Sequence, residues 1–211
     1  MGTEHGTSLD PRDNRQRRTL LQVTGLNAGL FAGLIVAGLA SESSALIANA
    51  LDNLSDAAAY ALSFFAVTRS DRWKVAAASV TGVMLLVLAV GVTVDALRRF
   101  VVGSEPLGPW MMAAAVGAAA INLWCIFLLR SQHGEDVNMR AAWTMSINDF
   151  ASNFGILLAG GLVVLMGRNW PDLVVALLIA LVAISGGVRT LKDAHQTLQS
   201  SGTDSTGHRH D

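Results

Sequence analysis

The sequence predicts an all-α membrane protein, a bundle of six transmembrane helices. Two observations of composition favour a membrane: 52% of the 211 residues are hydrophobic and only 15% are charged, whereas soluble domains carry about 25% charged residues. The third observation is six mostly apolar segments, each close to the roughly 20 residues with which a helix spans a bilayer. In lipid, only α-helices and closed β-barrels satisfy all of their backbone hydrogen bonds internally. The apolar runs are unbroken and lack the alternation of apolar and polar residues that is typical of barrel strands, so we expect helices.

The apolar segments predict where the spans lie. We expect them at residues 19–41, 44–68, 75–97, 107–129, 140–166 and 170–191, separated by short polar connections. The regions outside them, residues 1–18 and 192–211, are polar and rich in small residues. Such composition is typical of disordered segments, so we expect two short tails flanking one transmembrane domain.

The basic residues predict the orientation. With both termini on one side, that side receives twelve of the fifteen Lys and Arg residues, and the other receives Arg98, Arg99 and Arg168. Cytoplasmic segments near the spans carry the excess of Lys and Arg. We therefore expect both termini in the cytoplasm. No cleavable signal is expected, because the first apolar run begins near Leu20 and is too long for one.

Three aspartates interrupt the apolar spans. Asp52 and Asp56 lie four residues apart in the second span, and Asp149 lies in the fifth. Ionisable residues inside a membrane are costly and mark ion pathways by default. Residues at i and i+4 share one helix face, and two unpaired carboxylates there repel each other unless they share a proton or hold a cation. This pair therefore favours an exchanger of cations and protons.

A second helix supplies the remaining candidate ligands. Counted from the basic residues that flank the spans, Asp149 and Asp56 lie at depths that agree to about one helical turn. Met145 and Asn153 lie four residues before and after Asp149 on its face, and Asn148 lies about 100° away. We predict a cation site between the second and fifth spans whose ligands are Asp52, Asp56 and Asp149, with Met145, Asn148 and Asn153 as further candidates.

The other intramembrane polar residues have structural interpretations. Asparagines in spans usually form hydrogen bonds between helices, which we expect of Asn27, Asn49, Asn53 and Asn122. Asp95 is expected to form an ion pair with Arg98 or Arg99 on its own helix. Cys125 is the only cysteine, so the chain can form neither a disulfide framework nor a thiolate metal cluster.

These motifs resemble the cation diffusion facilitator family of divalent-metal exporters. SALIANALDNLSD is similar to the family stretch in which His or Asp is followed four residues later by Asp, with Asp52 and Asp56 in those places. NMRAAWTMSINDFASNFGILLAG is similar to the fifth-span stretch with His-x-x-x-Asp, in which Met145 replaces the usual His. VDALRRFV is similar to the family's ending of span three. The resemblance covers residues 15–195.

The resemblance implies a secondary transporter that exports zinc or a related divalent ion by alternating access, driven by inward proton movement. It implies a member without the family's C-terminal cytoplasmic domain, in which a homodimer would be held by transmembrane helices. The expected ion, Zn²⁺ or Cd²⁺, is cargo. No cofactor and no nucleic-acid partner are expected, and the expected location is the bacterial inner membrane, surrounded by lipid.

Ligand chemistry leaves alternatives open. A carboxylate-rich site without imidazole also suits the harder ions Mn²⁺ and Fe²⁺, whereas a methionine sulfur favours softer ions. The same acids would serve a proton or monovalent-cation pathway. A non-transporting membrane partner of another carrier is a further alternative. An enzyme is not expected, because the short loops contain no nucleophile–base pair, phosphate-binding loop or cofactor motif.

Overall fold

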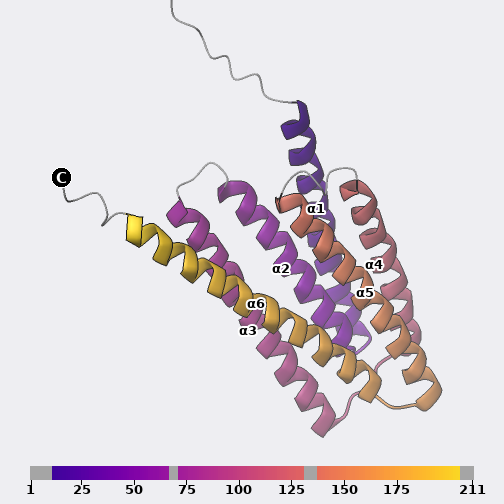
Figure 1. Ribbon diagram of the computed structural model, residues 1–211. Coiled ribbons are helices and arrows are strands. Elements are labelled where there is room, and N and C mark those ends of the chain that lie inside the picture. The colour runs from indigo at the N-terminus through magenta and orange to yellow at the C-terminus, as the bar shows by residue number, and fades with distance from the viewer. Residues whose placement is uncertain (1–10, 67–70, 131–136, 205–211) are drawn as a thin grey trace, which may run out of the picture.

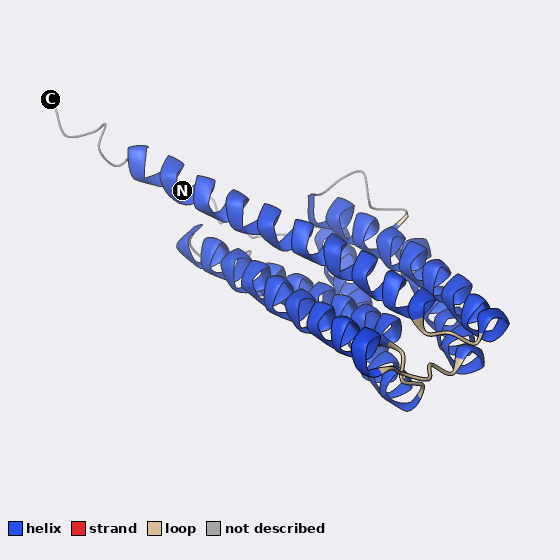
Figure 2. Cartoon of the chain, turned by 90° about the horizontal axis from the view of Figure 1, so that it is seen from below, coloured by secondary structure: helices blue, strands red, loops and turns tan. Residues whose placement is uncertain are grey.

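The computed structural model describes residues 11–66, 71–130 and 137–204, which form helices and no strand (Figure 1, Figure 2). The predicted all-α bundle is confirmed. In chain order the helices are α1 (Pro11–Ala40), α2 (Ser44–Ala66), α3 (Asp71–Val102), α4 (Gly108–Leu129), α5 (Val137–Met166) and α6 (Trp170–Asp204). All of these except α2 have both the length and the mean hydropathy of a membrane span.

The first and last helices extend beyond the spans that we expected. α1 begins at Pro11 and α6 continues to Asp204, so residues 11–18 and 192–204 are helical and not disordered. A helix satisfies the hydrogen bonds of its own backbone, so it continues through polar residues with good helix propensity, such as Arg, Gln and Lys. Residues 1–10 and 205–211 of the expected tails lie outside the described residues.

α2 lies at the centre of the bundle (Figure 1). On one side, α1 and α5 both pack against α2 and against α4, so α1, α2, α5 and α4 form a closed ring. On the other side, α3 and α6 pair closely with each other, and both contact α2. Large exposed hydrophobic side chains occur on all five outer helices, but none lies on residues 44–61 of α2. The neighbouring helices therefore shield this part of α2 from lipid.

Glycines permit the closest approach between helices. A Cβ added at Gly108 of α4 would lie 2.5 Å from the carbonyl oxygen of Gly160 and 2.6 Å from Cγ2 of Val164, both on α5. Similarly, a Cβ at Gly82 of α3 would lie 3.1 Å from the carbonyl oxygen of Gly187 on α6. Small residues at such crossings allow van der Waals contact between backbones, which drives helix association in membranes.

We expect Gly108→Ala to lower the thermal unfolding midpoint of the purified protein in detergent. The added methyl group would force α4 away from the Gly160 carbonyl, and overpacking of this kind costs about 1–3 kcal/mol. Gly117→Ala is the matched control, because it lies on the same helix and has nothing within 4 Å of the added Cβ. Equal midpoints for the two variants would contradict the close α4–α5 contact.

A buried aspartate from α6 holds the start of α2. Asp172 accepts hydrogen bonds from the Ser43 hydroxyl (2.5 Å) and from the backbone N–H groups of Ser44 (2.8 Å) and Ala45 (3.1 Å). The first N–H groups of a helix have no partner within the helix, and a carboxylate there also complements the helix dipole. The sequence did not single out Asp172 for this role, because its partners lie 127–129 residues earlier in the chain.

The same end of the bundle carries the ion pair that the sequence predicted. Arg99 donates from Nε to Asp95 (2.8 Å) on α3, and from Nη1 to the backbone oxygen of Glu42 (2.7 Å). The Ser44 hydroxyl also donates to Asp95 (3.0 Å). These bonds join α3 to the connection between α1 and α2.

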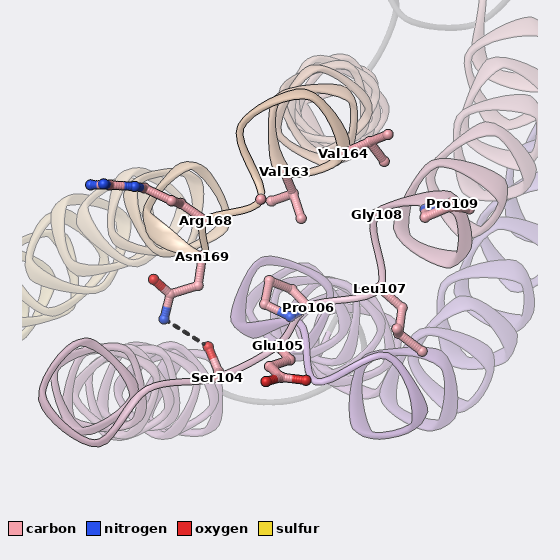
Figure 3. A pocket seen from close by; sticks show the side chains of 11 residues that line it. Ser104, Glu105, Pro106, Leu107, Gly108, Pro109, Val163, Val164, Arg168 and Asn169 are labelled. Atoms are coloured by element: carbon pink, nitrogen blue, oxygen red, sulfur yellow. Dashed lines mark hydrogen bonds between the residues drawn. The ribbon is translucent and has the colours of Figure 1, made fainter.

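A cavity of about 440 Å³ opens beside this network, between the α3–α4 connection and the end of α5 (Figure 3). Asn169 donates a hydrogen bond to the Ser104 hydroxyl across its rim (3.0 Å). None of the candidate ligands predicted from the sequence lines this cavity.

Candidate functional site

A layer of buried polar side chains crosses the ring of α1, α2, α5 and α4. Apolar side chains lie on both sides of it: Leu30, Met111 and Ile156 belong to the larger buried cluster, and Val23 and Cys125 to a smaller one. Between these clusters, each of the four helices carries polar residues on its buried face, which are at most 6% exposed: Asn27, Asn49, Asn53, Asp56, Asn122, Ser146, Asp149 and Asn153. We call this set the polar layer.

Two hydrogen bonds fix the register of α2 and α5. Asn49 donates from Nδ2 to Oδ1 of Asn153 (2.9 Å), and the Tyr60 hydroxyl donates to the backbone oxygen of Ala142 (3.4 Å). The two bonds are eleven residues apart on each helix, so the helices are antiparallel and in constant register. Asp149 therefore lies opposite residue 53, at a height between Asp52 and Asp56.

The three aspartates interact but do not converge. The charges of Asp52 and Asp149 both act on Asp56, and that of Asp52 acts on Asp149. Asp56 and Asp149 are buried in the ring, and Asp52, one turn from Asp56 on α2, also lines a narrow cavity of about 10 Å³ against α3 and α6. Among the described residues, no three Asp, Glu, His or Cys side chains lie close enough to hold one metal ion. The three-carboxylate site stays a prediction.

The other candidate ligands have different surroundings. Asn153 uses both ends of its amide, since Nδ2 donates to the backbone oxygen of Asp149 (2.8 Å) and Oδ1 accepts from Asn49. Met145 is half-buried and packs against the smaller apolar cluster. Asn148 is exposed, so the structure does not bring it to the polar layer.

The buried asparagines form fewer bonds between helices than we expected. Asn49 does bond to a second helix, but Asn27 and Asn53 donate to backbone oxygens four residues earlier on their own helices (2.9 and 2.8 Å). Among the described residues, Asn122 finds no hydrogen-bond partner. An Asn side chain in a helix reaches the carbonyl of the preceding turn, and this local bond replaces the expected one. The prediction of interhelical bonds was therefore wrong for these three residues.

The fold and the polar layer define an integral membrane protein with acids at the depth of its helix centres. Residues 20–199 match the family described as cation efflux transmembrane domain. The chain belongs to this family, which confirms the resemblance to the cation diffusion facilitators.

Curated relatives agree with this assignment. The chain is 31% identical over 205 residues to the zinc transporter ZitB of Escherichia coli strain K12, covering 90% of the chain and 64% of the relative. It is 22% identical over 173 residues (75% and 56%) to the cadmium, cobalt and zinc/H(+)-K(+) antiporter of Bacillus subtilis strain 168. It is 23% identical over 193 residues (86% and 60%) to the metal cation efflux system protein CzcD of Cupriavidus metallidurans. The matches thus span 56–64% of these relatives' lengths.

Proposed function

We propose that the protein exports a divalent metal cation, with Zn²⁺ or Cd²⁺ preferred, in exchange for protons. The observation that carries the proposal is the placement of Asp56 and Asp149, both buried, at matching depth on neighbouring helices. The names of the relatives support the choice of ion and of proton coupling, since they include zinc, cadmium and H(+).

Metal and protons compete for the same oxygens in this mechanism. A divalent ion binds carboxylates in their unprotonated form, so binding releases protons. Buried like charges without a cation are costly and are relieved by protonation. The carrier therefore returns with protonated acids after it has released the metal, and the proton gradient drives export.

Binding one ion requires Asp52 to approach the other two acids. In the structure Asp52 lies one turn from Asp56 on nearly the same face of α2, at the edge of the ring, where it also lines the narrow cavity against α3 and α6. We propose that the cation draws Asp52 towards Asp56 and Asp149 as the α3–α6 pair moves against the ring. Small sliding movements of packed helices are an established form of such transitions.

The orientation that we propose has both termini in the cytoplasm of a bacterial inner membrane. It rests on the twelve basic residues on that side. In this orientation the network of Asp95, Arg99 and Asp172 lies at the outer end of the bundle and holds that end closed.

The test is transport by the full chain in proteoliposomes that contain a zinc-sensitive dye. We expect Zn²⁺ and Cd²⁺ to enter faster when the lumen is acidic, and millimolar Na⁺ or K⁺ to leave the flux unchanged. Proton flux without metal flux would overturn the proposal in favour of a proton or monovalent-cation pathway. A lack of both fluxes would favour a non-transporting partner, and preference for Mn²⁺ or Fe²⁺ would correct the choice of ion.

A further inference from the structure

Two asparagines of the polar layer lie on α1 and α4, outside the site between α2 and α5. Asn27 is 1% exposed and Asn122 is fully buried. Within the segments that the structure describes, Oδ1 of Asn27 and both amide atoms of Asn122 have no hydrogen-bond partner. Burying an unpaired amide costs free energy, and an apolar side chain of similar size would avoid that cost. These two residues therefore need an explanation other than packing.

Contacts between α4 and α5 place Asn122 at the depth of Asp149. Gly108 lies against Gly160 and Val164 at one end of this helix pair. The two helices are antiparallel. When this register is continued along them, the height of Asn122 agrees with that of Asp149 to within about one residue. The charge of Asp149 also acts on the thiol of Cys125, three residues from Asn122 on α4.

Contacts between α1 and α4 place Asn27 at about the same height in the bundle as Asn122. The N–H of Leu107, immediately before α4, donates to the backbone oxygen of Ser41, immediately after α1 (2.9 Å). The same register pairs Val23 with Cys125, and both residues belong to the smaller apolar cluster. Asn27 therefore lies within about one residue of the height of Asn122.

The unpaired atoms are mainly oxygens. The Nδ2 groups of Asn27 and Asn53 are engaged with carbonyls of their own helices (2.9 and 2.8 Å), which leaves their Oδ1 atoms free. In the described part of the chain, the buried side-chain atoms without partners are Oδ1 of Asn27, Oδ1 of Asn53, Oδ1 and Nδ2 of Asn122, and Oδ2 of Asp149. Four acceptors and one donor cannot satisfy one another, whereas a cation can satisfy several acceptors at once.

We propose that Asn27, Asn53 and Asn122 form, together with Asp149, a second binding site for the transported divalent cation inside the α1–α2–α5–α4 ring, which we call the second station. This inference rests on the proposed function. With one carboxylate and three neutral amides, the station binds the ion more weakly than three carboxylates do. Rapid passage requires binding that is strong enough to admit an ion and weak enough to release it. Asp149 belongs to both stations and passes the ion between the amides and the aspartates of α2.

The test compares Asn27→Leu, Asn122→Leu and the double variant with wild type in zinc flux and in calorimetric Zn²⁺ binding. We expect the double variant to lose the weaker binding event, to slow zinc flux at least tenfold, and to keep the tighter affinity within twofold. Its metal-free thermal midpoint should not fall, because the substitutions remove unpaired buried amides. Thr24→Val is the control on α1, since its hydroxyl bonds to Leu20 of its own helix outside the polar layer.

Several outcomes decide the proposal. Wild-type flux and stoichiometry in the double variant would overturn the second station while leaving the proposed function intact, whereas absent flux in wild type would overturn the proposed function itself. Should the leucine variants fail to fold, Asn122→Asp provides an independent measurement. A carboxylate in place of the amide should tighten the weaker Zn²⁺ binding at least tenfold, and an unchanged affinity would overturn the station.

Discussion

Asp149→Asn is expected to abolish zinc binding and to raise the thermal stability of the metal-free protein. Asp149 is 1% exposed, has one oxygen without a partner, and is repelled by Asp52. A neutral amide of the same shape removes both the buried charge and the repulsion. Zinc affinity should fall more than about 100-fold, since even residues that only orient a metal ligand contribute 10–100-fold. Calorimetry and thermal unfolding, each with and without zinc, measure the two effects.

The opposite directions of these changes distinguish a binding residue from a structural one. A ligand that binds only the folded protein raises its unfolding midpoint, so zinc should stabilise wild type but not the variant. Glu105→Gln is the control, because Glu105 is an exposed acid outside the polar layer, and should behave as wild type. A less stable Asp149→Asn variant with normal zinc affinity would show that the carboxylate is structural.

Asp172→Ala is expected to destabilise the protein by about 3 kcal/mol or more, the largest stability loss that we predict. The substitution leaves one hydroxyl and two backbone N–H groups at the start of α2 buried without their acceptor. Denaturation of the purified protein in mixed detergent micelles measures the loss. Asp172→Asn keeps one acceptor oxygen in place and should lose much less. Equal losses for the alanine and asparagine variants would contradict the capping role.

The positions of the helices were predictable because each span is encoded locally, by a run of apolar residues of the right length. α4, for example, was expected at residues 107–129 and forms over Gly108–Leu129. The ends of α1 and α6 were not predictable in this way. The hydropathy of a segment indicates where the lipid ends, but a helix of polar residues can continue beyond it.

The candidate site was predictable in depth but not in direction. Counting residues along two spans brought Asp56 and Asp149 to similar heights, which agrees with the observed register. Which neighbour each side of a helix meets depends on tertiary packing, so the exposure of Asn148 and the cavity that Asp52 lines against α3 and α6 could not be read from one sequence. Asn122 did carry a signal, because it continues the stripe of Ala115, Ala118 and Cys125 along α4.

The enclosure of α2 has a consequence for how the chain enters the membrane during synthesis. Among the helices that the structure describes, α2 alone lacks the hydropathy of a span, and each aspartate near its centre opposes insertion by about 2.5–3.5 kcal/mol. It therefore partitions poorly as a single segment. The short connection of residues 41–43 keeps α2 next to α1, so we expect the two helices to insert as a hairpin, with α3, α5 and α6 completing the burial of α2. The burial of α2 therefore depends on helices that are synthesised after it, α3, α5 and α6.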